Sequence, residues 1–523
     1  MSDTAPSQQE TSHTYSVGRF LYLTAAINGG VILIIEILGA KMLSPFFGTS
    51  HFVWTAQIAS TLISLACGYY FGGWLADRKP KLDGLFLCMG GAAIYLAFAT
   101  LVLEPVAYFF LGFELALGSV LMALFLFFIP LTLLAVTVPF LVRVTHAQSK
   151  NLGVQVGRLS AISTVGSVIG TLLISYVLIP LAPNSTTMML VVLLELALVA
   201  IFFLARKTSS TPKGPLLAGL LAGTGMAFGA MDDESRRSPA IGKTLYQQNS
   251  NFGLMQVVDA PSGDVRYYLN DYLTQNIYDP KAEQSLTVFT YMLHGLAHAY
   301  HPNPQNILCI GLGVGIAPMQ WAEEGAKVDV VEINPGVVEV GERFFGLDPS
   351  QFNLTIGDGR HFLNASKDQY DVVILDAFLG DSSPSHLMSQ ECFQSMRQKM
   401  KEDAVLVINA FGNFSQGEDF FMASLDKTLR SVFGSLVIHD GTRGNVFFVA
   451  SPKKVLPVLR EMDLSKVHPK IKPFVETAWK NTASARPENG VLITDDYNPV
   501  EYYDSKMRES IRKNFAMRMR GRH

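Results

Sequence analysis

Glycines and acidic residues in the second half of the chain follow predicted strands at a spacing that could hold a nucleoside. Gly311-Leu-Gly313-Val-Gly315 comes directly after the apolar segment 306–310, and glycines in such a turn let the backbone approach a ligand closely. Glu332 ends the next apolar segment, seventeen residues past Gly315. A carboxylate at that point can accept hydrogen bonds from both hydroxyls of a ribose.

Two further acids occur where a nucleoside would need them. Asp358 and Gly359 lie in IGDGR (356–360), after a third strand, and Asp376 ends a fourth strand, 370–376. An acid in such a loop is often only a helix cap, but ligands on open α/β sheets bind at the carboxyl ends of the strands. One crevice can therefore collect all these residues. Several carboxylates without a basic partner suit a nucleoside that carries a positive sulfonium better than a phosphate.

From about residue 241 onward, the pattern of elements that must position these residues predicts a soluble α/β protein. A hairpin (253–259 and 264–270) indicates a small β-domain over 241–280, and a helical stretch follows at 281–299. Strands alternating with helices then predict a parallel, doubly wound, Rossmann-like sheet within 281–505. The last two strands, 436–439 and 445–450, lie so close in sequence that they predict an antiparallel hairpin at its edge.

The first half of the chain reads as a membrane domain. Charged residues make up only 16% of the sequence and hydrophobic residues 49%, against about 25% charged in soluble proteins. After a polar segment, 1–19, we expect about seven transmembrane helices within 20–231, and then a linker at 232–240. The predicted spans are 20–40, 53–76, 84–103, 115–142, 159–183, 187–205 and 214–231.

The same composition limits the partners. The net charge of −3 argues against nucleic acid, and the four cysteines form no C-x-x-C pair, so no metal is expected. Within the spans, Asn28, Glu36 and Glu195 should face the helix bundle, because polar groups are costly in lipid. A passage for a cationic amine is one interpretation of Glu36, and an internal polar contact is the other.

Basic residues predict which loops face the cytoplasm. Three loops carry the positive charge and the opposite loops carry only Lys41, which places the three loops and the N-terminus inside. Seven complete spans would put the soluble half outside, although adenosylmethionine-type donors are made in the cytosol, and the basic tail 506–523 also suits the cytoplasmic leaflet. We therefore expect that 214–231, or another span, does not fully cross an inner membrane. The basic residues of the three loops are Arg78, Lys79, Lys81, Arg143, Lys150, Arg158, Arg206, Lys207 and Lys213.

The soluble half resembles the spermidine synthase (polyamine aminopropyltransferase) family, which is built on the Rossmann-like methyltransferase fold. The likeness rests on HPNPQNILCIGLGVG (301–315), VVEINPGVVEVG (330–341), IGDGR, and YDVVILDAF followed by Asp381-Ser-Ser-Pro384. The membrane half resembles the integral segment fused to such domains in bacteria, through IEILGAKMLSPFFGTSHFVWT (35–55) and GYYFGGWLADR (68–78).

This resemblance implies transfer of an aminopropyl group from decarboxylated S-adenosylmethionine to an amine, which leaves methylthioadenosine. Glu332 would hold the ribose and Asp358 the adenine. Asp376 would orient and deprotonate the attacking amine, because an ammonium is no nucleophile until it loses a proton. Gln248 and Gln275 would close over the donor. A homodimer is expected by the resemblance alone.

Departures from the family pattern affect the amine half of the site. Val314 stands where the family's glycine loop carries an aspartate, and Phe289 stands where the family has a tyrosine. Asp381 and Asp495 are the candidates for holding the amine instead, although acids in such positions are more often helix-cap or turn residues.

Two alternatives to aminopropyl transfer stay open. One is an enzyme that uses S-adenosylmethionine itself, by methyl transfer or by donor cleavage. The other is a polyamine transporter whose soluble domain senses a nucleoside.

Overall fold

The computed structural model describes residues 8–48, 51–146, 151–205, 213–236, 241–378, 384–415, 417–441 and 444–499. The chain forms two compact units, Met1–Arg237 and Ser238–His523. The boundary falls within the segment 232–240 that the sequence marks as a linker, but the last helix of the first unit continues to Arg236. The linker is therefore shorter than expected, because the polar end DDESR is still compatible with a helix.

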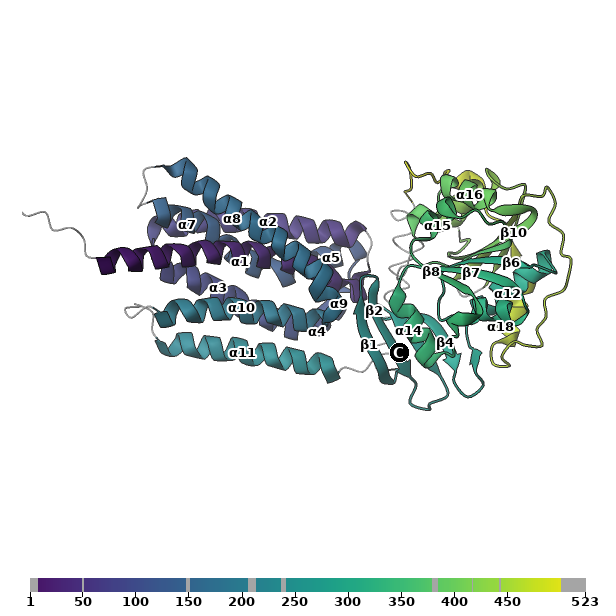
Figure 1. Cartoon of the computed structure of the whole chain (residues 1–523), viewed down its shortest axis with the longest axis horizontal. Coiled ribbons are helices and arrows are strands. Elements are labelled where there is room, and N and C mark those ends of the chain that lie inside the picture. Colours follow the sequence, from purple (N-terminus) through teal and green to yellow (C-terminus); the bar gives the residue numbers. More distant parts are fainter. Residues whose placement is uncertain are drawn as a thin grey trace, which may run out of the picture. The chain divides into compact units, whose positions relative to one another are not determined.

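The described part of the first unit is helical (Figure 1). Seven of its helical segments are long and apolar enough to cross a membrane: 18–47, 52–78, 82–101, 115–145, 152–181, 184–205 and 214–231. They correspond to the seven predicted spans, including the last. The helices are α1 (Gln8–Phe47), α2 (His51–Arg78), α3 (Leu82–Leu101), α4 (Leu103–Phe110), α5 (Leu115–Ala123), α6 (Ile129–Ala135), α7 (Thr137–His146), α8 (Leu152–Leu173), α9 (Ile179–Leu181), α10 (Asn184–Ala205) and α11 (Lys213–Arg236), with π-helical turns at Leu124–Phe128 and Ile174–Leu178.

Small residues allow α1 and α8 to pack closely. A Cβ atom on Gly166 of α8 would lie 1.8 Å from the backbone oxygen of Ala26, and one on Gly170 would lie 2.5 Å from that of Gly30. This spacing of glycines four residues apart is the one that brings helix backbones together in membranes, where packing replaces the hydrophobic effect.

Two of the three polar residues predicted to face the bundle are buried. Asn28 is 1% exposed and donates to the backbone oxygen of Leu134 (3.3 Å) and to Thr137. Glu195 is 2% exposed, and neither of its carboxylate oxygens has a hydrogen-bond partner among the described residues. Glu36 is only half-buried.

The second unit begins with a five-stranded antiparallel sheet in sequence order. Its strands are β1 (Lys243–Ser250), β2 (Gly253–Asp259), β3 (Arg266–Asn270), β4 (Leu273–Asp279) and β5 (Gln284–Ser285). The predicted hairpin is present as β2 and β3, with Met255 opposite Asn270. The predicted helical stretch at 281–299 starts too early, because Ser285 pairs with Tyr278 as part of β5, and α12 (Val288–Tyr300) begins after it.

The rest of the second unit is a Rossmann-like fold of the methyltransferase type. Its eight-stranded sheet has the order β13-β11-β12-β10-β9-β6-β7-β8. The five strands from β10 to β8 are parallel, and β11 and β12 form the predicted antiparallel hairpin. The strands are β6 (Asn306–Ile310), β7 (Lys327–Glu332), β8 (Asn353–Ile356), β9 (Tyr370–Leu375), β10 (Met400–Phe411), β11 (Ser435–Asp440), β12 (Asn445–Ser451) and β13 (Thr482–Ala483).

Helices cover both faces of this sheet, with α12 and α18 on one side and α15 and α16 on the other (Figure 1). The apolar runs are buried on both faces: in β6, Ile307 and Cys309 join one core while Leu308 and Ile310 join the other. Such strands read as continuous apolar runs because neither face meets water. The helices are α13 (Ile316–Glu323), α14 (Pro335–Phe344), α15 (Gly359–Ala365), α16 (Gln390–Gln398), α17 (Phe420–Arg430) and α18 (Lys472–Lys480).

Candidate active site

A cavity of about 960 Å³ lies at the carboxyl ends of the parallel strands in the second unit. Residues at or directly after the ends of β6, β7, β8, β9 and β10 line it, and one wall comes from Thr274–Ile277 of β4 and the start of α12. The predicted residues Gly311, Gly313, Glu332, Asp358, Gly359, Asp376 and Gln275 all line this cavity.

The glycine turn has the backbone conformation that its sequence requires. Gly311, Gly313 and Gly315 all have positive φ angles, of 98°, 56° and 86°. A Cβ atom on Gly311 would lie 2.2 Å from the backbone oxygen of Asp376, so a side chain is excluded there by contact as well as by conformation. Gly315 precedes α13 and packs against Leu347; it is not among the cavity-lining residues.

Glu332 joins the glycine turn to the next strand. Its Oε2 accepts from the Leu312 amide (3.0 Å) and its Oε1 from the Asn334 amide (2.7 Å). Burial raises the pKa of Glu332, although these amide bonds oppose the shift. The carboxylate is thus fixed in position, and each oxygen keeps a second lone pair that can accept from a ribose hydroxyl.

Asp358 both caps a helix and faces the cavity. Its Oδ1 accepts from the His361 amide (2.9 Å) at the start of α15, and its Oδ2 lies 2.8 Å from His386 Nε2. Partial burial acts to raise the pKa of Asp358, but the His361 amide and the His386 imidazole together hold it below its usual value. The carboxylate therefore stays ionised over the neutral range, as an acceptor for an amino group must.

Asp376 lies at the end of β9 and is oriented by a chain of amides. Asn409 Nδ2 donates to Asp376 Oδ1 (2.9 Å), and Asn445 Nδ2 donates to Asn409 Oδ1 (2.9 Å). Burial raises the pKa of Asp376 to about 6, and the Asn409 bond opposes that shift. A carboxyl group with this pKa can take up a proton near neutral pH, which is the property of a general base.

The described residues that line the cavity carry negative charge without positive charge to balance it. The three carboxylates are Glu332, Asp358 and Asp376, and none of the described lining residues is Lys or Arg. An arrangement of this kind attracts cations and repels phosphate groups.

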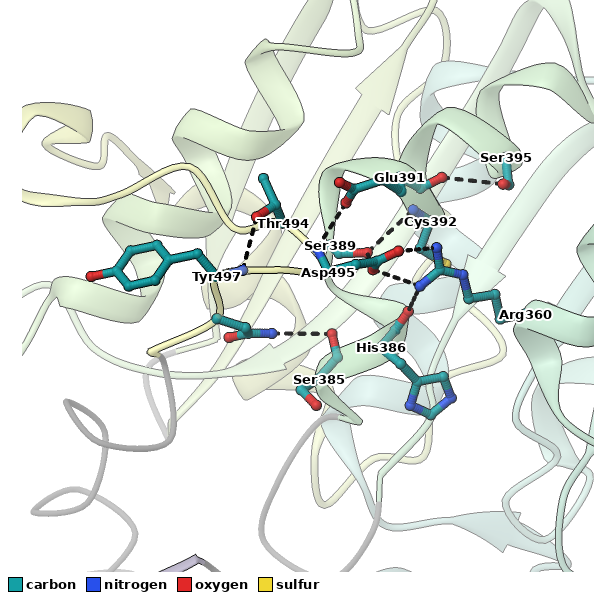
Figure 2. Close-up of polar contacts among 11 residues, drawn as sticks. Arg360, Ser385, His386, Ser389, Glu391, Cys392, Ser395, Thr494, Asp495 and Tyr497 are labelled. Carbon is teal, nitrogen blue, oxygen red and sulfur yellow. Dashed lines mark hydrogen bonds and ion pairs between the residues drawn. The ribbon is translucent and has the colours of Figure 1, made fainter.

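Gln248 and Asp495 do not lie where the sequence interpretation put them. Gln248 is exposed on β1 and outside the cavity lining, where it accepts from the Tyr246 hydroxyl. Asp495 is also absent from the lining. It forms a two-point ion pair with Arg360 (2.6 and 2.5 Å) and accepts from the Ser389 hydroxyl (Figure 2). Asp495 is therefore held by protein groups, as in its turn-acid interpretation, and Asp381 lies outside the described residues.

Several lining residues were missed from the sequence. Asn409 could have been found, because it ends the strand AVLVIN and the strand-end rule applies to it as to Asp376. Asn445 begins an antiparallel strand, and the start of such a strand lies at the same edge of the sheet as the ends of the parallel ones. Phe378 and Phe411 pack against each other with ring centroids 4.8 Å apart and add an apolar wall. Phe289, already noted as standing where the family pattern has a tyrosine, lines the cavity at the start of α12.

Comparison with known proteins identifies a domain in the second unit. The Spermine/spermidine synthase domain matches residues 286–438, which include the glycine turn and all three cavity carboxylates. A polyamine aminopropyltransferase from Vibrio vulnificus is 38% identical over 141 residues, which cover 26% of this chain and 46% of that protein. The second unit therefore contains a spermine/spermidine synthase domain over residues 286–438.

Other relatives of this spermidine synthase-like chain are more distant. A probable polyamine aminopropyl transferase of Bifidobacterium longum is 30% identical over 155 residues, covering 29% of this chain and 34% of that protein. The crystal structure of spermidine synthase from Thermotoga maritima is 19% identical, with a TM-score of 0.35, and the match covers 51% of this chain and 88% of that chain. The chain thus spans less than half the length of the two curated relatives named here.

Proposed function

We propose that the second unit transfers an aminopropyl group from decarboxylated S-adenosylmethionine to an amine and releases methylthioadenosine. The observation that carries the proposal is the cavity with three carboxylates and, among its described lining residues, no Lys or Arg. Both substrates are cations, so the same charge that repels a phosphate favours them.

Each carboxylate has a place in this reaction. Glu332 accepts from the ribose hydroxyls and Asp358 from the adenine amino group. The sulfonium then points toward Asp376, whose pKa near 6 suits removal of a proton from the attacking amine. The amine nitrogen forms the new C–N bond as the C–S bond breaks, and the electron pair of that bond leaves on the neutral thioether. Because the sulfonium is already a good leaving group, orientation supplies most of the catalysis.

A second candidate reaction uses S-adenosylmethionine itself. Val314 is 1% exposed, belongs to the hydrophobic core and is not among the lining residues. The position that carries an acid in the family pattern therefore offers no carboxylate to the amino end of an aminopropyl group. This favours S-adenosylmethionine, which carries a methionine end instead of an aminopropyl group.

One experiment separates the candidates. The purified full chain is incubated with either donor, with and without putrescine, and the adenine-containing products are identified by mass spectrometry. Methylthioadenosine together with spermidine supports aminopropyl transfer. Adenosylhomocysteine supports a methyltransferase, and methylthioadenosine without an amine acceptor supports donor cleavage. No product from either donor, together with ligand-dependent polyamine transport, would support the transporter alternative.

The protonation of Asp376 should set the acid limb of the pH–rate profile. A general base is inactive when protonated, so kcat/KM should fall about tenfold per pH unit below pH 6. The Asn409 bond lowers the pKa of Asp376, so Asn409→Ala should move this limb upward by about 1–2 units, the equivalent of one hydrogen bond to a charged group. A limb that stays in place in Asn409→Ala would show that another group is the base.

We propose further that the first unit anchors the chain in an inner membrane with the second unit in the cytoplasm. Seven helical segments have the length and composition of spans, which supports the anchor. With the N-terminus in the cytoplasm, as the basic loops predict, the second unit is cytoplasmic only if one of the seven segments, such as 214–231, does not fully cross. We expect a reporter that is active only in the cytoplasm to be active when it is fused to the C-terminus. Activity of a periplasm-specific reporter at the same position would reverse the proposed orientation.

A further inference from the structure

Two histidines on α12 meet a glutamate next to α13, at a place that contributes nothing to the described lining of the cavity. His294 and His298 are four residues apart, so both side chains emerge from one face of the helix. His294 Nε2 lies 3.2 Å from Glu324 Oε1, and His298 Nε2 lies 2.7 Å from Glu324 Oε2. One donor atom from each of the three residues lies within 4.8 Å of the others.

Trp321 holds the two imidazoles in this orientation. Its ring is fully buried, and its centroid lies 4.3 Å from that of His294 and 4.5 Å from that of His298. The imidazole faces are thereby packed, and their Nε2 edges are directed at the carboxylate. The side chains of the three polar residues remain 17%, 19% and 30% exposed, so solvent and ions can reach the group.

The types of the three side chains suit a metal. His294 Nε2 is buried and has no hydrogen-bond partner among the described residues. Two imidazoles and one carboxylate form a donor set that zinc uses where its fourth position is open to water.

We propose that His294, His298 and Glu324 bind a zinc ion, with water as the fourth ligand. Zinc–ligand bonds of about 2.0–2.2 Å in a tetrahedron place neighbouring ligand atoms about 3.4 Å apart. The two imidazoles now contact different oxygens of Glu324, at 3.2 Å from Oε1 and 2.7 Å from Oε2, so small rotations of the side chains must bring one oxygen and both nitrogens to this spacing. Lys466 lies 3.8 Å from Glu324 and is 74% exposed, so it can move away as the ion enters.

An ion here would join two elements that also serve the cavity. The start of α12 contributes Phe289 to the cavity wall, and α13 begins directly after Gly315. Zinc would tie the C-terminal half of α12 to the end of α13 and so stabilise both elements. The expectation of no metal rests on cysteine spacing alone, which concerns thiolate sites and not imidazole ligands.

A second group of possible ligands lies near the end of the same helix and supplies a control. It consists of His301, Asp371 and Asp403. Asp371 already pairs with Lys401 (2.7 Å) and accepts from two backbone amides. Its charge is therefore neutralised, and this group is the weaker candidate.

The test is a zinc titration of the metal-stripped full chain by calorimetry, with thermal unfolding measured alongside. We expect one zinc ion per chain with a micromolar or tighter dissociation constant, and a melting temperature that rises with zinc. His294→Ala and His298→Ala should each weaken binding by at least about 10–100-fold, the loss typical of removing even an outer partner of a metal ligand. His301→Ala should bind as the unchanged chain does.

A third variant separates loss of zinc binding from loss of folding. Glu324→Gln keeps the shape of the side chain and an acceptor oxygen, so it should melt normally without zinc and still lose zinc binding. No binding by the unchanged chain would overturn the proposal, and so would equal binding by Glu324→Gln. Loss of binding in His301→Ala alone would assign the ion to the other group. None of these results depends on the transferase reaction, so the proposal stands or falls separately from the proposed function.

Discussion

Asp376→Asn should lower the rate of aminopropyl transfer by about 10²–10⁴-fold, the contribution typical of a positioned general base. The asparagine has nearly the same shape and can still accept from Asn409, but it cannot take the proton of the attacking amine. Turnover is measured as methylthioadenosine formed at saturating amine and donor. The acid limb of the pH–rate profile should disappear together with the activity, since the group that titrates is gone.

Affinity for the product separates a chemical role of Asp376 from a structural one. Methylthioadenosine is neutral at sulfur, so loss of the Asp376 charge should leave its binding nearly unchanged. Asp368→Asn makes the same chemical change in the loop before β9, on a side chain that is 60% exposed, and should keep full activity. An Asp376→Asn chain with normal turnover would remove this residue from the reaction.

Glu332→Gln should have the largest effect on binding. The glutamate can accept charge-assisted hydrogen bonds from the ribose, each worth about 1.5–3 kcal/mol, and losing one corresponds to about 10–150-fold in affinity for methylthioadenosine. The glutamine also turns an amide group toward one of the two backbone amides, of Leu312 and Asn334, that Glu332 now accepts from. Some loss of thermal stability is therefore expected as well.

Calorimetry with methylthioadenosine and a melting curve together test this prediction. Glu339→Gln is the matched control, because Glu339 is an exposed residue of α14 that pairs with Arg343. It should change neither quantity. A Glu332→Gln chain that melts earlier but binds the nucleoside normally would assign Glu332 to the fold alone.

The meeting of the glycine turn and the three carboxylates in one cavity was predictable because it follows from local pattern. Gly311, Glu332, Asp358 and Asp376 each come directly after a predicted strand, and a parallel sheet brings strand ends to one edge whatever else the chain does. The seven apolar helices long enough to span a membrane were predictable for a similar reason, since a run of consecutive apolar residues directly gives the length of such a helix.

The misplaced residues depend on partners that no local pattern reveals. Gln248 lies on an exposed part of β1 rather than over the donor, because the register of β1 against β2 decides its direction. The start of α12 was placed too early because Ser285 pairs with Tyr278, on another strand. Asp495 is held by Arg360, 135 residues away, and a short polar stretch in the sequence does not disclose which distant cation it meets.

The ion pair of Asp495 with Arg360 links the far end of the described chain to the part of the cavity wall that contains Asp358. Arg360 also donates to the backbone oxygen of His386 (3.2 Å), and the His386 imidazole meets Asp358. In the proposed reaction, substitutions in this ion pair could thus change the preference for a base without changing a residue that contacts the ligand. Among homologues, substitutions at positions 360 and 495 should occur together. A reversal of charge at one position should be accompanied by the opposite reversal at the other.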